Sequence, residues 1–375
     1  MEFQIRTPEL GKALARVQGI VEKKTTMPIL ANVLIKSKGK DAITVSATDL
    51  EIGHTADYEA KVIKAGALTV DARALHSIVK ALPEATVTIK QEANAWIVVA
   101  SGKSRYRIVG MAAESFPTLP KLDDVPFFAV DPVMLRSALD RVLHAVSTDE
   151  TRYNLTGVAV THLPGGNIRL CATDGHRLAL YERDIPGAVI PDGVIIPRKA
   201  IIEIKRMLDA GGDEARLGFV STSIVFERGG VVLTARRVDG KFPDVEQVIP
   251  TSAKLTATFD RAALLAAIKR VALLVPDKGQ GISVTLPTSE GEGEATLRSN
   301  NPDVGEAIEE VAVTLGMNGG KPGLVIGLNA AYLIDALGSL PEEKVSIDLI
   351  DELSPAVLRG ATPDQKAVVM PMRVV

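Results

Sequence analysis

An internal repeat with a period of about 125 residues is the feature that most constrains this chain. A segment with leucine, alanine, leucine or isoleucine, arginine and valine in one fixed frame occurs three times, starting at Phe3, Phe128 and Phe259. The first leucines of the first two segments, Leu10 and Leu135, are 125 residues apart. Such a period predicts three copies of one structural module.

Two further motifs keep the same period. Ala-Thr-Asp occurs at 47–49 and at 172–174, and Phe-Pro occurs at 116–117 and at 242–243. The copies meet at proline-containing stretches without a flexible Gly/Ser linker, so we expect neighbouring copies to pack directly against each other. The predicted domains are residues 1–122, 126–250 and 253–375.

Each copy combines two helices with several short strands. In the first copy Leu10, Leu14 and Val17 have the i, i+4, i+7 spacing of a buried helical stripe. Short β-rich runs, such as 43–46 and 96–100, predict hairpin-linked strands, and helices on one face of an antiparallel sheet define an α+β module. The second helix of each copy is expected at residues 74–82, 199–208 and 330–340.

Composition excludes several classes of protein. Cys171 is the only cysteine, so neither an intramolecular disulfide nor a cysteine-based zinc site can form, which fits a reducing, cytoplasmic environment. The first six residues alternate like a strand and predict no secretory signal. No run approaches the 18 apolar residues that predict a membrane span.

The common catalytic motifs are absent. Gly319-Gly320-Lys321 lacks the upstream glycine and the Ser/Thr of a phosphate-binding loop, and Gly279-Gln-Gly281 lacks the third glycine of a dinucleotide fold. No Gly-x-Ser-x-Gly segment and no helical pair of histidines occurs. We therefore expect no catalytic residues, no metal and no cofactor, although an active site assembled from distant residues stays open as an alternative.

Positive charge concentrates on the predicted helices although the net charge is −3. A basic stripe attracts phosphates of any base sequence, so it predicts binding to nucleic acid without sequence reading. A solvated helix face is the alternative, and the second helix of the third copy departs from the pattern with Asp335 and no Lys or Arg. Acidic residues concentrate elsewhere, at Asp49, Glu51, Asp57 and Glu59, at Glu290, Glu292 and Glu294, and at Glu306, Glu309 and Glu310. The basic residues are Lys12, Arg16, Arg136, Arg141, Arg261, Lys269 and Arg270 on the first helices, and Arg73, Lys80, Arg198, Lys199, Lys205 and Arg206 on the second.

Three motifs carry a specific family resemblance. Thr-Asp-Gly-His-Arg-Leu at 173–178, Val-Asp-Gly-Lys-Phe-Pro-Asp at 238–244 and Val-Val-Met-Pro-Met-Arg at 368–373 resemble the bacterial DNA polymerase III beta subunits, which are sliding clamps. The resemblance covers the whole chain. It implies three like domains per chain and two chains closing head to tail into a six-domain ring around duplex DNA. The ring would give a polymerase processivity in replication without catalysis of its own.

The resemblance also implies a surface that contacts DNA. Lys24 stands where the family often has arginine, which keeps the charge but loses the bidentate fork. Asn154 stands where a second tyrosine often follows Tyr153. The implied DNA contacts are Lys24, Arg73, Arg105, Arg152, Tyr153, Arg198 and Lys199.

A second implied site is an apolar pocket for short linear motifs of the polymerase III alpha subunit, the clamp loader delta subunit and other clamp-binding proteins. Methionines adapt to different partners, which a shared pocket needs. The plain alternative is that Met370, Pro371 and Met372 belong to a terminal strand of the third domain; the tail then ends in Val374-Val375, one residue longer than is usual. The implied lining is Leu155, Thr173, Gly175, His176, Arg177, Leu178, Pro243, Val248, Val368, Met370, Pro371 and Met372.

The dimer contact implied by the resemblance joins the first domain of one chain to the third domain of the other. Tyr106 and Ile108 would lie on one side, with Leu273 and Leu274 on the other, and strand pairing there would cover two sheet edges. These four residues could instead be ordinary core. A monomeric three-domain scaffold that binds only peptides is the alternative function from another class.

Overall fold

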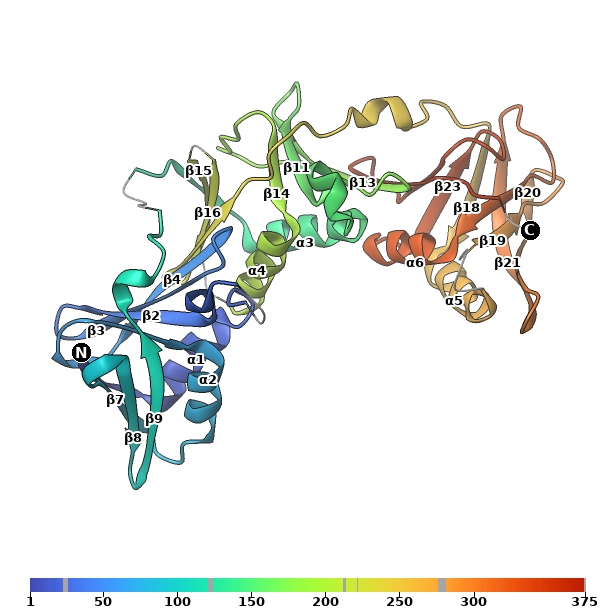
Figure 1. The fold of residues 1–375 in the computed structure, drawn as a ribbon. Helices are drawn as coiled ribbons and strands as arrows, with labels where there is room; N and C mark the ends of the chain where they lie inside the picture. The colour runs from blue at the N-terminus through green and yellow to red at the C-terminus, as the bar shows by residue number, and fades with distance from the viewer. Residues whose placement is uncertain (23–25, 121–123, 212–213, 221, 276–280, 374–375) are drawn as a thin grey trace. The chain divides into compact units, whose positions relative to one another are not determined.

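Two compact units make up the chain (Figure 1). The computed structural model describes residues 1–22, 26–120, 124–211, 214–220, 222–275 and 281–373. Unit one comprises Met1–Pro132, Gly187–Val189 and Lys199–Arg237, and unit two comprises Val133–Pro186, Ile190–Arg198 and Val238–Val375. Each unit contains one long antiparallel sheet with helices packed on it.

The predicted pair of helices is present in every copy. Helix α1 buries Leu10, Leu14 and Val17, the stripe that the sequence spacing predicts. Asp71, Asp260 and Asn329 accept hydrogen bonds from backbone N–H groups of the first turns of α2, α5 and α6, so these side chains fix where the helices begin. The six α-helices of the described residues are α1 (Thr7–Val17), α2 (Ala72–Ala81), α3 (Pro132–Val142), α4 (Arg198–Asp209), α5 (Arg261–Val271) and α6 (Ala330–Ser339).

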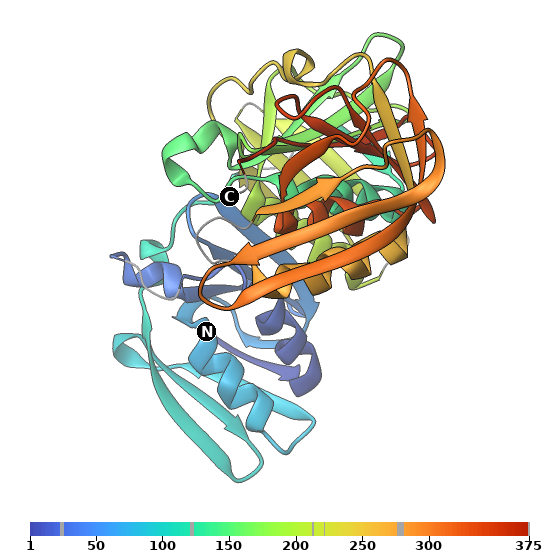
Figure 2. The ribbon, with the colours of Figure 1, turned by 90° about the vertical axis from the view of Figure 1, so that its right-hand side faces the viewer.

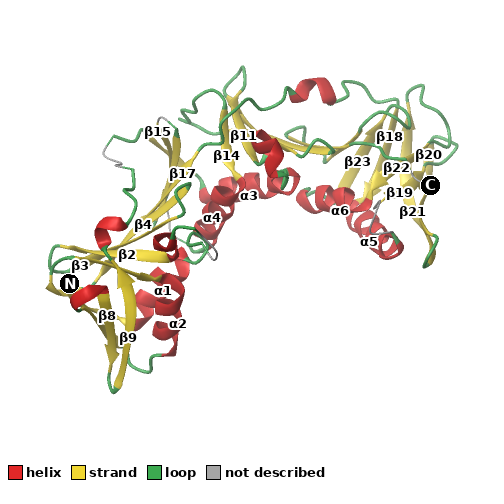
Figure 3. Ribbon diagram, in the orientation of Figure 1, coloured by secondary structure: helices red, strands yellow, loops and turns green. Residues whose placement is uncertain are grey.

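The sheet of unit one has the strand order β10-β15-β16-β17-β4-β3-β2-β6-β9-β8-β7-β1-β5. Helices α1 and α2 pack side by side on it (Figure 3). Its strands are β1 (Glu2–Arg6), β2 (Asn32–Lys38), β3 (Ala42–Thr48), β4 (Ile52–Glu59), β5 (Lys61–Lys64), β6 (Ala67–Asp71), β7 (Thr86–Gln91), β8 (Trp96–Ser101), β9 (Ser104–Met111), β10 (Phe127–Val130), β15 (Ala215–Val220), β16 (Ser223–Arg228) and β17 (Val231–Arg236).

The sheet of unit two has the strand order β14-β11-β12-β13-β25-β24-β23-β18-β21-β20-β19-β22. Helices α5 and α6 pack together over a core that includes Phe259, Leu264 and Ile268. Figure 2 shows the long β20–β21 hairpin of this unit in orange. Its strands are β11 (Gly157–His162), β12 (Asn167–Thr173), β13 (Arg177–Asp184), β14 (Val194–Pro197), β18 (Leu255–Asp260), β19 (Gly281–Thr285), β20 (Gly291–Asn301), β21 (Gly305–Met317), β22 (Val325–Asn329), β23 (Lys344–Leu349), β24 (Ala356–Arg359) and β25 (Gln365–Val369).

Strand pairing joins neighbouring copies directly, as the short connections predict. At the first junction β4 of the first copy pairs with β17 of the second, and His54 lies opposite Leu233. At the second junction β13 of the second copy pairs with β25 of the third, and Ala179 lies opposite Ala367. His54 and Ala179 are 125 residues apart, so corresponding residues of the first two copies lie at the two junctions.

In the first copy the counterpart of β17 and β25 is β9. In the third copy the counterpart of β4 and β13 is β21. Residues 104–109 of β9 pair with β8 on one side only, and β6 reaches only residues 110–111 on the other side. Residues 305–313 of β21 pair with β20, whereas β18 reaches only residues 314–317. Within the described part of the chain, β9 and β21 therefore each keep a stretch of unpaired edge.

Candidate functional site

The turn between β12 and β13 is built by its own side chains. The hydroxyl of Thr173 donates to the carbonyl of Arg177 over 2.6 Å and accepts from the N–H of Gly175 over 3.1 Å. Asp174 Oδ1 accepts from the N–H groups of His176 and Arg177 over 2.9 and 3.0 Å. These bonds fix a tight turn in which His176 is exposed at the tip.

Gly175 is required in this turn for two reasons. Its φ of +87° lies in the left-handed region that side-chain-bearing residues rarely adopt. A Cβ at this position would also lie 2.7 Å from Nη1 of Arg152, which comes from the short 3₁₀ helix η5 (Glu150–Leu155). The turn and η5 are therefore in close contact.

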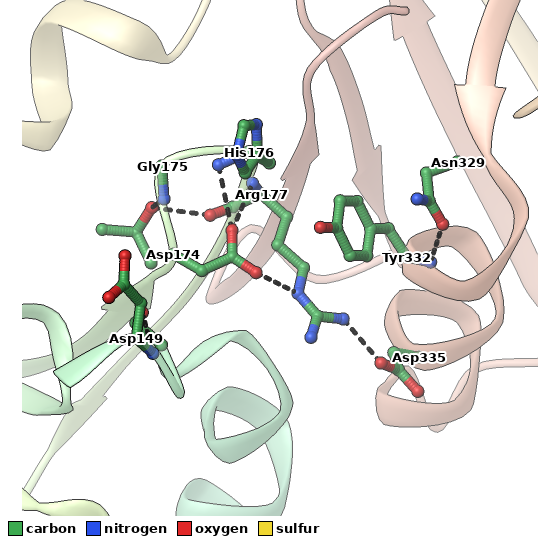
Figure 4. A network of polar contacts seen from close by, with 10 residues as sticks. Asp149, Asp174, Gly175, His176, Arg177, Asn329, Tyr332 and Asp335 are labelled. Carbon is green, nitrogen blue, oxygen red and sulfur yellow. Dashed lines mark hydrogen bonds and ion pairs between the residues drawn. The ribbon is translucent and has the colours of Figure 1, made fainter. Parts of the chain in front are cut away.

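Arg177 connects this turn to helix α6 (Figure 4). Its Nε lies 3.0 Å from Oδ2 of Asp174, and its Nη1 lies 2.5 Å from Oδ2 of Asp335. The guanidinium also stacks over the ring of Tyr332, 4.4 Å from the ring centroid. Tyr332 is not among the site residues that the sequence predicts. Asp335 appears in the sequence analysis only because its helix carries no Lys or Arg.

An apolar cluster lies beneath the turn. Leu178 of β13 and Val368 of β25 are buried with Cys171, and Phe242 and Ile249 pack against the same cluster. Burial raises the pKa of the Cys171 thiol to about 12, so this thiol stays protonated and behaves as an apolar residue. Of the other residues predicted for the pocket, Leu155 and Thr173 are buried as well.

The chain end lies beside the turn and is only partly covered. Strand β25 ends at Val369, so Met370 and Met372 lie beyond it, contrary to the alternative in which they continue a terminal strand. The N–H of Met370 donates to the carbonyl of His176 and that of Met372 to the carbonyl of Gly327, both over 2.9 Å. Met370 and Val248 are 39% and 43% exposed. Pro243 is exposed and Pro371 partly buried.

These residues combine a buried apolar floor with the exposed side chains of Met370 and His176 and the largely buried guanidinium of Arg177. Such a surface suits a short peptide that inserts apolar side chains and bonds through its backbone. In the described ranges no group of three or more His, Cys, Asp or Glu side chains is arranged to hold a metal ion. Among the described helices, none is both long enough and apolar enough to span a membrane.

Two of the predicted DNA contacts lie on η5. Arg152 Nε is 3.1 Å from Oδ2 of Asp149, and the side chain of Tyr153 is 58% exposed. Asn154, which departs from the family pattern, donates its amide to the carbonyl of Lys241 over 3.0 Å. Asn154 thus connects η5 to the 238–244 segment instead of presenting a second aromatic ring.

The remaining residues predicted to contact DNA differ in their exposure and in their contacts within the chain. Arg105 is 70% exposed with Glu92 3.6 Å away, and Arg198 is exposed at the start of α4. Arg73 Nη2 lies 3.4 Å from the carbonyl of Val21. Lys24 lies outside the described residues.

The prediction that acidic and basic residues lie in separate regions is wrong at Lys199, which contacts Asp49. Its ammonium group contacts the carboxylate of Asp49, whose side chain is only 5% exposed, and lies 3.4 Å from the carbonyl of Ile20. A buried carboxylate needs a partner, so Lys199 fills a structural role in unit one. Glu309 likewise contacts Arg270, with 2.6 Å between Oε1 and Nε.

Two further arginines of the predicted basic stripe face inward. Arg141 donates to the side chain of Gln365, and its guanidinium stacks 4.8 Å from the ring centroid of Tyr181. Arg261 donates to the carbonyls of Glu342 and Leu337 over 2.8 and 3.4 Å. The position of an arginine along a predicted helix does not show whether it faces inward or is exposed, because inward-facing and exposed arginines both occur at the edge of the apolar stripe.

The residues predicted for the dimer contact are not ordinary core. Leu273 is 80% exposed and Tyr106 is 38% exposed, whereas Ile108 and Leu274 are partly buried. Tyr106 and Ile108 lie on the stretch of β9 with the unpaired edge. Val109, on the same strand, is 62% exposed.

Comparisons with known proteins identify the family. The N-terminal, central and C-terminal domain models of the DNA polymerase III beta subunit match residues 1–120, 129–244 and 246–373. Proteins named beta sliding clamp from Caulobacter vibrioides and Pseudomonas aeruginosa are each 36% identical to this chain, over 381 and 382 residues, with full coverage of both chains.

Solved structures agree with these matches. The sliding clamp of Caulobacter crescentus with polyethylene glycol bound superposes with a TM-score of 0.92 at 35% identity. The sliding clamp of Bartonella birtlesii bound to griselimycin superposes with a TM-score of 0.91 at 33% identity. Both comparisons cover 100% of each chain. With matches over all three copies, the chain belongs to the DNA polymerase III beta subunit family.

Proposed function

We propose that two copies of this chain join head to tail into a ring that encircles duplex DNA and tethers the replicative polymerase and other DNA-processing proteins. The chain functions as a sliding clamp, a processivity factor and not an enzyme. Encirclement prevents dissociation by topology, and contacts to phosphates leave the ring free to slide over any base sequence. The domain boundaries 1–122, 126–250 and 253–375 and a cytoplasmic location belong to this proposal.

The observation that carries the ring is the pair of matching junctions. Within the chain β4 pairs with β17 and β13 pairs with β25, and the corresponding strands left over are β9 and β21. A heterologous contact closes into a ring only if its rotation does so, and a third junction of the same kind repeats the geometry of the first two. Pairing β21 of one chain with β9 of a second chain also covers two exposed sheet edges.

The two free edges are complementary in charge. Transferring the register of the first junction places Arg107 of β9 opposite Glu306 of β21, and Tyr106 opposite Ala307. Arg107 is 53% exposed beside Glu92, and Glu306 is 53% exposed beside Arg298. Opposite charges across an antiparallel pair stabilise it and select the register.

Charge reversal tests this contact. The wild-type chain should sediment at about twice its 39.8 kDa mass at micromolar concentration. Arg107→Glu should weaken the dimer by repulsion from Glu306, and adding Glu306→Arg in the same chain should restore it. Arg183→Glu, which changes an exposed arginine on β13, is the matched control and should remain dimeric. A monomeric wild type would support the peptide-binding scaffold instead.

DNA encirclement is tested separately from dimerisation. The ring should remain on circular DNA and slide off after the DNA is linearised, because only a closed substrate retains a topological clamp. The proposed lining consists of Lys24, Arg73, Arg105, Arg152, Tyr153 and Arg198; Lys199, which the resemblance places with them, is engaged by Asp49 and contributes little to DNA binding. Equal retention on circular and linear DNA would rule out encirclement even if the chain is a dimer.

The partner-binding surface is the second part of the proposal. We infer that the turn at 173–178, the 242–249 segment and the tail from Val368 to Met372 bind short motifs of the polymerase III alpha subunit, the clamp loader delta subunit and other clamp-binding proteins. The apolar floor would take the apolar side chains of such a motif. Tyr332 would extend this surface toward α6.

A further inference from the structure

A cavity of about 420 Å³ lies at the first junction, within unit one. Helices α1 and α4 form its sides, and strands β4 and β17 contribute His54 and Leu233. A volume of this size lies within the range of small-molecule sites. The proposed ring and partner surface make no use of it.

His54 lines this cavity and has unused hydrogen-bonding capacity. The side chain is 3% exposed, and neither ring nitrogen has a hydrogen-bond partner among the described residues. Burial, followed by the charge of Arg16, lowers the pKa of His54 to about 4, so the ring is neutral at pH 7. A neutral imidazole offers one donor and one acceptor to a ligand.

Two arginines and one glutamate add a net positive charge. Arg16 Nη1 makes a long hydrogen bond of 3.3 Å to the hydroxyl of Tyr58. Arg206 is 60% exposed and contacts Glu203, whose side chain is 7% exposed. A Cβ at Gly19 would lie 2.1 Å from Nη1 of Arg206 and 2.2 Å from Oε1 of Glu203, so this glycine lets the ion pair approach the end of α1.

The second junction differs from the first at the position beside Arg16. There Tyr181 occupies the position that Ala56 has at the first junction, 125 residues earlier. The guanidinium of Arg141, the counterpart of Arg16, stacks on Tyr181 and donates to Gln365. The smaller Ala56 leaves Arg16 without an aromatic ring to stack on at the corresponding place.

We propose that the cavity at the first junction binds a small molecule with one carboxylate and an apolar body. The carboxylate would lie between Arg16 and Arg206, the apolar body would pack on Leu233 and Met207, and a polar atom would bond to His54. A ligand that contacts both α1 and α4 binds the folded chain only, so it should stabilise unit one.

The test uses the full-length chain without DNA or partner peptides, so its result is independent of the clamp function. The probes are 2-naphthoate and its uncharged amide, 2-naphthamide. Binding is followed by calorimetry and by the ring resonances of histidine in isotope-labelled protein. We expect 2-naphthoate to bind once per chain, to shift the His54 resonances and to raise the melting temperature, with the amide at least about tenfold weaker because the arginines favour the anion.

Three variants locate the site. Arg16→Gln should weaken 2-naphthoate about tenfold, and Leu233→Phe should abolish binding by filling the cavity. Lys12→Gln removes an exposed lysine one turn earlier on α1, where it pairs with Glu9, and should bind like wild type. If Leu233→Phe lowers stability, Arg16→Gln alone decides the location. Failure of 2-naphthoate to bind at millimolar concentration, equal binding of the amide, or equal weakening by Lys12→Gln would each overturn the proposal.

Discussion

Nη1 of Arg177 lies 2.5 Å from Oδ2 of Asp335, which connects strand β13 of the second copy to helix α6 of the third. Arg177 is 14% exposed and Asp335 is 44% exposed. The same guanidinium contacts Asp174 in its own turn, so one side chain fixes the turn and its orientation toward α6. Asp335, the exception to the basic pattern of the helices, therefore has a structural reason.

Replacing Asp335 with asparagine should weaken the binding of a clamp-binding peptide about fivefold, which corresponds to the roughly 1 kcal/mol that a half-exposed ion pair contributes. Arg177 would keep its contact with Asp174 but lose its orientation toward α6. Fluorescence anisotropy with a labelled peptide measures the change. Glu227→Gln on β16, which removes the ion-pair partner of Arg216, serves as the control. Unchanged affinity in Asp335→Asn would show that the orientation of Arg177 is irrelevant to binding.

Truncation before Met370 should abolish peptide binding and leave a folded chain. Strand β25 ends at Val369 and keeps its pairing with β13, while the truncation removes the backbone hydrogen bonds of Met370 and Met372. We expect a loss of about 2 kcal/mol in unfolding free energy, roughly 1 for each lost hydrogen bond. Denaturant unfolding and peptide titration check the two effects. A truncated chain that fails to fold would assign the tail to the core.

The elements of this fold follow from local sequence, whereas the contacts between them do not. The spacing of Leu10, Leu14 and Val17 predicts α1 because helical periodicity is visible within a few turns. The contact between Asp49 and Lys199 joins residues 150 positions apart, and charge alone does not indicate which residue pairs with which.

The candidate site shows the same division. The 173–178 motif is visible in the sequence because the hydrogen bonds that form its turn are local. Tyr332 was not predictable, because an aromatic residue in the first turn of an ordinary helix carries no signal until Arg177 is found stacked on it. The sequence shows Asn154 only as a departure from the family pattern, because the hydrogen bond of its amide to the carbonyl of Lys241 spans 87 residues.

Arg198 and Lys199 are adjacent but should respond differently to substitution. Arg198→Ala should weaken DNA binding and lower the salt dependence of the binding constant by about one unit, as expected for one lost phosphate contact. Lys199→Ala should instead lower stability because the buried carboxylate of Asp49 loses its cationic partner. Salt titrations on circular DNA and thermal unfolding separate the effects. A fall in salt slope for Lys199→Ala with unchanged stability would contradict this division.

The chain should lose stability as the pH falls from about 6.5 to 4 because two buried histidines resist protonation. Burial, with the charge of Arg16, lowers the pKa of His54 to about 4. Burial, with the charge of Arg177, does the same for His144, although Asp335 and Asp174 oppose it. In this window the unfolded chain binds protons that the folded chain does not, so acid favours unfolding. For His54 the full effect is about 3 kcal/mol, reached below pH 4.

Replacing His54 with leucine should therefore reduce the loss of melting temperature between pH 7 and pH 4.5. The leucine cannot be protonated, so the unfolded state no longer gains a proton at this position, and all other groups contribute equally to both chains. His176→Gln, which changes an exposed histidine at the tip of the turn, should keep the wild-type loss. If His54→Leu loses as much melting temperature as wild type, the imidazole of His54 is not kept neutral by burial, and the acid sensitivity must come from other groups.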